Sequence, residues 1–196
     1  ALSKLTSIFP NANIAAFTAT ADKQTRNDIA SKFFIKKSNI FMRGFDRPNL
    51  FLEVRQKEHF KESLLQYLKK RQGLSGIIYC LSRRETDEIT VFLSSNGFNA
   101  IAYHAGKSTQ YRKEAYDRFG TELAVVMVAT IAFGMGIDKS DIRFVVHASL
   151  PGNMESFYQE IGRAGRDNLP SETLLFYGLG DLNQRKRMIL EADGSD

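Results

Sequence analysis

Five short apolar runs, separated by amphipathic segments, constrain the fold of this chain more than any other feature. They are rich in Ile, Val and Leu and cover residues 76–81, 100–103, 123–129, 142–147 and 173–177. Near-continuous apolar runs of this length are typical of strands that are covered on both faces, as in a parallel sheet. Strands that alternate with helices predict an α/β fold with a mainly parallel sheet.

Helix signals fill the gaps between these runs. Ser82 and Glu85 form a capping box at the start of one helix, and Gly97 stands where that helix is expected to end. Asn153 is the expected N-cap of a later helix. Apolar residues at helical spacing predict further helices over residues 59–72 and 109–119.

The composition excludes several classes of protein. The only cysteine is Cys80, so the chain has no internal disulfide and no cysteine-rich zinc site, which fits a reducing, intracellular setting. No apolar run approaches the ~18 residues of a membrane span. The net charge of +5 hints at an anionic partner, but the whole excess lies in residues 1–45, so the case for nucleic acid depends on the motifs.

The first 45 or so residues differ from the remainder. They offer one strand-like run at 13–17, one helix from Asp22 to about Phe34, and a short apolar run near Ile40. That is too little to bury a core of its own. Turn-forming residues at 43–49 suit a linker. We therefore expect residues 1–43 to be the tail of an earlier domain.

The string QEIGRAGRD at 159–167 carries two arginines three positions apart, so Arg163 and Arg166 are expected on one face of a helix end. Its glycines allow a ligand or another surface to come close. A guanidinium is planar, permanently charged and bidentate, which suits a polyphosphate, and it stabilises charge on a transferring phosphoryl group. A solvated helix end is the alternative, but the complete string favours the phosphate site.

The string ATIAFGMGID at 129–138 directly follows the longest apolar run. Ligand-binding loops follow the carboxyl ends of such strands. The Thr130 hydroxyl and free N–H groups around Gly134 and Gly136 could hold a nucleic-acid phosphate, and Asp138 could accept a hydrogen bond from a ribose hydroxyl. A tight turn in which Asp138 caps the next segment and Phe133 packs inward explains the same residues equally well.

Two shorter strings have simple structural explanations. Thr18 and Thr20 could relay hydrogen bonds between sites, although a strand end followed by Asp22 as an N-cap is the simpler interpretation. The string AGKST at 105–109 ends like a P-loop, but the position that needs the first glycine is Ile101. A strand-to-helix turn capped by Ser108 or Thr109 is expected there instead.

In this order, the strings resemble the motifs of the RecQ family of superfamily 2 DNA helicases, over about residues 1–180. The matching strings are FTATA at 17–21 (motif III), FDRPN at 45–49 (the segment that joins the motor lobes), IYCLSR at 78–83 (motif IV), YHAG at 103–106 (the turn after it), residues 128–138 (motif V) and 159–167 (motif VI).

The resemblance implies half of a two-lobed RecA-like motor. It implies a strip of the first lobe at 1–43, the second lobe at 44–180 with a three-layer α/β sandwich of P-loop NTPase type, and a helical tail at 181–196. ATP and Mg²⁺ would lie between the lobes, held mainly by the first. The motor would unwind DNA in the 3′-to-5′ direction in repair and recombination.

The resemblance also implies roles for single residues. Arg166 would be the arginine finger with Arg163 beside it, and Asp138 the ribose contact. The other nucleotide-site positions would be Gly136, Gln159 and Gly162. The positions along the path of single-stranded DNA would be Ser82, Arg83, His104, Gly106, Thr130 and Met135. Thr18 and Thr20 would couple the two sites.

Some family features are expected outside this chain. The P-loop, the acidic box and the aromatic-rich loop would lie before Ala1, and a zinc subdomain would follow residue 180. We expect this chain alone to be an inactive monomer without zinc or a membrane segment. Its expected partners are the first lobe of the same parent chain and single-stranded and forked DNA. The alternatives are a lobe of an RNA helicase and a nucleic-acid-binding module without hydrolysis.

Overall fold

The computed structural model describes residues 5–9, 11–18, 23–33, 39–41, 46–134 and 137–193. The chain divides into two compact units, residues 1–46 and 47–196. The description of each unit below stands by itself.

The described residues of the first unit form two helices, α1 (Leu5–Ile8) and α2 (Lys23–Phe33). The second of these confirms the helix that the sequence predicts from Asp22 to about Phe34. The strand-like runs were wrong, because residues 13–17 and 39–41 form no strand. A strand needs a neighbour to pair its N–H and C=O groups, and the described part of this unit supplies none. Phe17 is accordingly 94% exposed.

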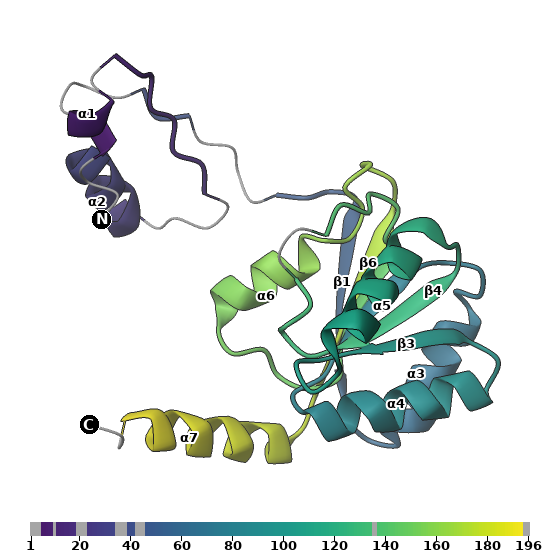
Figure 1. Cartoon of the computed structure of the whole chain (residues 1–196). Helices are drawn as coiled ribbons and strands as arrows, with labels where there is room; N and C mark the ends of the chain where they lie inside the picture. Colours follow the sequence, from purple (N-terminus) through teal and green to yellow (C-terminus); the bar gives the residue numbers. More distant parts are fainter. Residues whose placement is uncertain are drawn as a thin grey trace. The chain divides into compact units, whose positions relative to one another are not determined.

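The second unit is built on a six-stranded, all-parallel sheet (Figure 1). The strands are β1 (Leu50–Gln56), β2 (Gly76–Tyr79), β3 (Asn99–Tyr103), β4 (Val125–Ala129), β5 (Phe144–His147) and β6 (Ser171–Tyr177). Their order across the sheet is β1-β6-β5-β2-β4-β3. Five of the six strands fall on the apolar runs that the sequence predicts, which confirms the parallel α/β architecture.

Helices cover both faces of this sheet. They are α3 (Phe60–Lys69), α4 (Arg83–Ser95), α5 (Thr109–Thr121) and α6 (Met154–Ile161), followed by α7 (Leu179–Asp193). One buried cluster packs α3 and α4 against one face of the strands. A second cluster packs α5, Ala164 and the segment around Phe133 against the other face. The result is the expected three-layer sandwich, in which central strands such as β4 are fully buried.

The predicted helix caps are confirmed. Ser82 Oγ accepts a hydrogen bond from Glu85 N at 3.1 Å, and Glu85 Oε2 accepts one from Leu81 N at 3.1 Å. Asn153 caps α6 by accepting from Ser156 N at 2.7 Å. Ser108 caps α5, so the AGKST string is the strand-to-helix turn that the sequence predicts rather than a phosphate cradle.

Strand β1 is the element that the sequence reasoning missed. It lies at one edge of the sheet, pairs with β6 alone, and has only Leu50 buried. Phe51, Leu52 and Val54 are all more than half exposed. The mixture of apolar and charged residues therefore lacks the continuous apolar run that identifies the other strands.

Candidate functional site

Four predicted nucleic-acid residues lie at one edge of the sheet. Strands β2, β4 and β3 are neighbours, and their last residues, Tyr79, Ala129 and Tyr103, lie in register. Ser82 and Arg83 closely follow β2, while His104 and Thr130 directly follow β3 and β4. We call this end of the three strands the carboxyl edge. It is the edge at which open parallel sheets bind ligands.

The turn from β2 into α4, residues 80–83, presents two of these residues to solvent. Ser82 and Arg83 are exposed. The capping hydrogen bond uses one lone pair of Ser82 Oγ and leaves its O–H free to donate. A Cβ placed on Gly106 would lie 3.2 Å from Arg83 Cδ, so these two segments touch. Gly106 therefore leaves room for Arg83 to lie across the neighbouring turn.

His104 is buried and its ring is held on both sides. Nδ1 accepts from Gly106 N at 3.1 Å, and Nε2 lies 3.2 Å from both carboxylate oxygens of Asp87. This arrangement places the ring proton on Nε2, where it donates to Asp87. His104 therefore shapes the turn that presents Gly106, because both of its ring nitrogens are engaged within the second unit.

Asp87 also pairs with Lys107, whose Nζ lies 2.9 Å from Oδ1. Burial alone would raise the pKa of Asp87, but hydrogen bonds from Lys107 and His104, together with the charge of Lys107, lower it overall. The lysine of the AGKST string thus has a carboxylate partner. It stabilises the folded unit through this ion pair.

The segment that follows β4, residues 130–142, is called the glycine loop here. Thr130 is half-buried, and its carbonyl accepts from Phe133 N at 3.0 Å. Phe133 is 1% exposed and packs against Phe119 and Tyr103, which confirms that it points inward. Asp138 is exposed at the far end of the loop.

Other residues that the sequence predicts for the site lie elsewhere. Met135, Gly136 and Thr20 lie outside the described residues, and Thr18 is exposed in the first unit.

The two arginines of the QEIGRAGRD string lie beyond α6, on the segment 162–170, which we call the arginine loop. Gly162 ends α6, and Gln159 is exposed on its last turn. Arg166 is exposed, and its Nη1 donates to the carbonyl of Ile137 at 2.6 Å. A Cβ on Gly134 would lie 2.7 Å from Arg163 Nη2, so Arg163 also contacts the glycine loop.

The charges of these two arginines are not compensated. No carboxylate forms an ion pair with Arg163 or Arg166 within the described parts of the chain. Arg163 Nε is buried and lacks a hydrogen-bond partner there. A buried donor without a partner is costly and is rare in folded proteins. An anion with several oxygen acceptors fits this arrangement.

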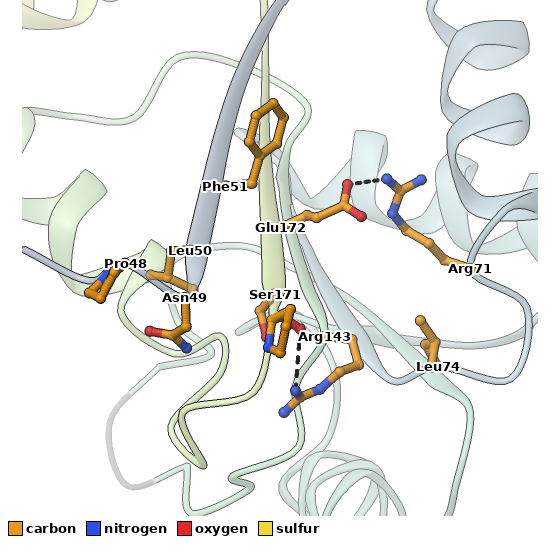
Figure 2. A pocket seen from close by; sticks show the side chains of 10 residues that line it. Pro48, Asn49, Leu50, Phe51, Arg71, Leu74, Arg143, Ser171 and Glu172 are labelled. Atoms are coloured by element: carbon orange, nitrogen blue, oxygen red, sulfur yellow. Dashed lines mark hydrogen bonds and ion pairs between the residues drawn. The ribbon is translucent and has the colours of Figure 1, made fainter.

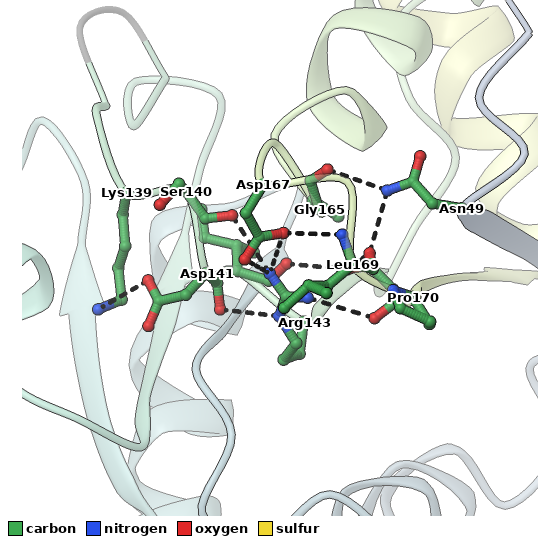
Figure 3. Close-up of polar contacts among 12 residues, drawn as sticks. Asn49, Lys139, Ser140, Asp141, Arg143, Gly165, Asp167, Leu169 and Pro170 are labelled. Atoms are coloured by element: carbon green, nitrogen blue, oxygen red, sulfur yellow. Dashed lines mark hydrogen bonds and ion pairs between the residues drawn. The ribbon is translucent and has the colours of Figure 1, made fainter.

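The arginine loop is fixed by a third arginine, Arg143, at the start of β5 (Figure 3). Arg143 Nη2 donates to both carboxylate oxygens of Asp167, at 2.7 and 2.6 Å. Its Nε donates to Asp141 O at 3.1 Å. The hydrogen bonds from Arg143 lower the pKa of Asp167. The last residue of the QEIGRAGRD string therefore anchors the loop.

Arg47 and Asn49, in the string read as a linker, clamp the same loop from the other side. Arg47 Nη2 donates to Gly165 O at 2.8 Å, and Asn49 Nδ2 donates to Gly165 O at 2.9 Å and to Leu169 O at 3.0 Å. A Cβ on Gly165 would lie 2.5 Å from Asn49 Nδ2, and φ at Gly165 is +57°. Sequence reasoning missed this role because hydrogen bonds between residues so far apart leave no periodic signal.

A buried polar network of Tyr79, His147 and Glu160 lies close to Arg163. His147 Nε2 lies 2.6 Å from Glu160 Oε2, and the His147 ring stacks on Tyr79. The Tyr79 hydroxyl donates to Phe133 O at 3.2 Å. Burial raises the pKa of Tyr79, and the charge of Arg163 opposes that rise. The network connects the ends of β2 and β5 with α6 and the glycine loop.

One pocket of roughly 560 Å³ opens at the opposite end of the strands, near the starts of β1, β5 and β6 (Figure 2). Arg71 and Glu172 form an ion pair on its wall, and Phe51 and Leu74 supply apolar surface. Arg143, which directly precedes β5, also lines this pocket. None of the candidate nucleotide-binding or DNA-binding residues lines it, although Pro48 and Asn49 of the FDRPN string do.

The described residues offer neither a metal site nor a membrane span. No group of three or more His, Cys, Asp or Glu side chains could hold a metal ion there. No helix in that part of the chain is long and apolar enough to cross a membrane.

Comparison with known proteins places these features in a family context. The helicase conserved C-terminal domain family matches residues 59–168. The ATP-dependent DNA helicase RecQ of Pasteurella multocida is 45% identical over 190 residues, which cover 97% of this chain and 30% of the relative. The ATP-dependent DNA helicase Q1 of Pongo abelii is 42% identical and covers 93% of this chain and 29% of its own length. These matches confirm the resemblance to RecQ helicases.

A solved structure gives an independent test of the fold. A DEAD box protein from the hyperthermophile Methanococcus jannaschii aligns with a TM-score of 0.60 at 24% identity, over 90% of this chain and 48% of its own. The likeness confirms the expected RecA-like sandwich. The chain spans about 30% of the length of the Pasteurella multocida and Pongo abelii relatives.

Proposed function

Because this chain belongs to the helicase conserved C-terminal domain family, we propose that it is the second RecA-like lobe of an ATP-dependent DNA helicase of RecQ type. We call that longer protein the parent helicase. Its first lobe would supply most of the contacts to ATP and Mg²⁺. Hydrolysis would drive 3′-to-5′ movement on single-stranded DNA and the unwinding of forked duplexes in repair and recombination.

The observation that carries this proposal is the pair of uncompensated arginines on a rigid loop. Arg166 is held by a backbone carbonyl, and Arg163 has a buried donor without a partner in the described region. Both side chains touch the glycine loop. An arginine held in this way can stabilise the charge that spreads over a γ-phosphoryl group during its transfer. Asp138, Gly136, Gln159 and Gly162 complete the nucleotide side of the proposal.

The carboxyl edge supplies the proposed path for the DNA strand. The exposed Ser82 and Arg83 lie beside the exposed Gly106, which has no side chain and lets a phosphate come close to them. Thr130 lies on the neighbouring strand end, and Met135 is assigned to the same path. Contacts of this kind position a backbone without reading its sequence. Thr18 and Thr20 would relay the state of one site to the other.

The experiment is a set of rate measurements on the parent helicase. We expect ATP hydrolysis that rises at least about tenfold with single-stranded DNA, and unwinding of a forked DNA duplex but not of the matched RNA duplex. Residues 1–196 alone should hydrolyse no ATP and behave as a monomer. Preference for the RNA duplex would favour an RNA helicase. Salt-dependent strand binding by a parent without ATPase activity would favour a binding module.

A further inference from the structure

Lys57 belongs to none of the motifs. Its side chain lies where three other segments of the second unit meet. It follows β1 directly, and its Nζ lies 3.0 Å from Ser149 Oγ, 3.3 Å from Asp181 Oδ1 and 3.4 Å from Glu85 Oε1. These partners come from the segment after β5, the first turn of α7 and the first turn of α4. One ammonium group therefore bridges two carboxylates from different helices.

Glu85 connects this junction to the proposed DNA site. Its second carboxylate oxygen accepts from Leu81 N at 3.1 Å, and its own N–H donates to Ser82 Oγ. The conformation of the turn at residues 80–83 thus depends on where the Glu85 side chain is held. Lys57 and Ser149 hold it from the side away from that turn.

Asp181 connects the junction to α7. Its Oδ2 accepts from Gly178 N at 2.9 Å, which fixes the start of the helix. Further along, Arg185 Nε donates to Leu150 O at 2.9 Å and fastens α7 to the segment after β5. The Asp181 side chain is only 9% exposed and that of Lys57 is 22% exposed, so solvent screens their attraction only in part.

We propose that Lys57 is a positioning residue that couples the docking of α7 to the turn at residues 80–83, and thereby to the affinity for single-stranded DNA. The inference rests on the proposed function. Without the ammonium group, the carboxylates of Glu85 and Asp181 lose their shared counter-charge. Glu85 is then free to leave Leu81 N, and the turn that presents Ser82 and Arg83 loses its support.

The test is Lys57→Met in the parent helicase, because methionine keeps most of the length and apolar stem of lysine. We expect the dissociation constant for a labelled single-stranded oligonucleotide, and the DNA concentration for half-maximal ATPase, to rise about fivefold. The maximal kcat, the basal ATPase and the KM for ATP should stay within about twofold of the wild type. A general loss of structure would lower kcat as well.

A second variant tests the coupling from α7. Asp181→Asn should weaken strand binding about twofold to threefold, although Asp181 belongs to a helix outside the proposed DNA path. The double variant Lys57→Met with Asp181→Asn should be no weaker than Lys57→Met alone. Additive effects in this cycle would overturn the coupling.

Lys61→Met is the matched control. It removes the same charge from an exposed position of α3, where the ammonium lies over the ring of Phe92 rather than between carboxylates. It should bind the strand like the wild type. Normal binding by Lys57→Met and Asp181→Asn in an active parent would overturn this inference alone. A wild-type parent that bound no single strand would overturn the proposed function, and the inference with it.

Discussion

Arg143 anchors the arginine loop and Arg163 belongs to it, but the two arginines have opposite surroundings. Arg143 donates to both oxygens of Asp167 and to the carbonyls of Ser140 and Asp141, so its charge is matched and its donors are used. Arg163 has a buried Nε without a partner and no carboxylate partner among the described residues. The paired arginine holds the loop, and the unpaired one, with Arg166, leaves positive charge for a ligand.

The largest expected effect comes from deleting the unpaired charge. Arg166→Ala in the parent helicase should lower kcat for ATP hydrolysis about 10³-fold, because the charge of the transferring phosphoryl group loses its stabilisation. The dissociation constant for ATP should change by less than about threefold. Arg118→Ala removes an exposed arginine that is paired with Glu122, and should hydrolyse ATP normally. Near-normal turnover by Arg166→Ala would show that Arg166 is not the arginine finger.

The next effect tests how tightly the loop is held. Gly165→Ala adds a Cβ 2.5 Å from Asn49 Nδ2 at a φ of +57°, so it should lower the free energy of unfolding by about 2–4 kcal/mol. Denaturant titration measures this change. Gly120→Ala is the control, because a Cβ there meets nothing within 4 Å. Equal stability of the two variants would mean that the loop can move away at little cost.

Breaking the ion pair between Arg143 and Asp167 should have a smaller effect on catalysis than deleting Arg166. Asp167→Asn removes the charge that holds Arg143 but keeps an acceptor for Leu169 N, so kcat should fall about tenfold with little change in the KM for ATP. Glu122→Gln breaks a comparable exposed pair with Arg118 at the end of α5 and should leave kcat unchanged. If both variants kept full activity, the anchoring of the loop would be irrelevant to catalysis.

The smallest effect is a dependence of stability on pH. The hydrogen bonds from Arg143 lower the pKa of Asp167 in the folded state below its unfolded value. The stability that this carboxylate contributes is therefore present above the unfolded value of about 3.9 and is lost as the pH falls through the lower folded value. Denaturant titration should give a higher free energy of unfolding for the wild type than for Asp167→Asn at about pH 6. This difference should narrow toward about pH 3. A difference that does not vary with pH would exclude the carboxylate charge as its source.

The sequence predicts the interior of this lobe well and its edges poorly. Strands such as β4 are apolar on both faces, and the caps at Ser82 and Asn153 use local chemistry, so both leave strong local signals. Strand β1 was missed because this edge strand has one buried residue and a mixed sequence, LFLEVRQ, that gives neither a long apolar run nor a regular alternation. The expected strand at 13–17 failed because pairing depends on a neighbour that a local pattern cannot supply.

The candidate site divides in the same way. The residue strings identify Arg163 and Arg166 as a pair, and the structure brings both to the glycine loop. The clamps made by Arg47, Asn49 and Arg143 join positions more than 20 residues apart, and no spacing rule predicts them. The inward orientation of His104 was also missed, because its partner Asp87 is known only once α4 is placed beside β3.

The central claim is that the unpaired arginines act on the charge of the transferring phosphoryl group. The most direct measurement is the affinity of the parent helicase and its Arg166→Ala variant for ADP with and without aluminium fluoride, which mimics that group. We predict an unchanged dissociation constant for ADP and a loss of about 100-fold or more in affinity for the ADP–aluminium fluoride complex. Equal losses for both ligands, or no loss for either, would contradict the claim.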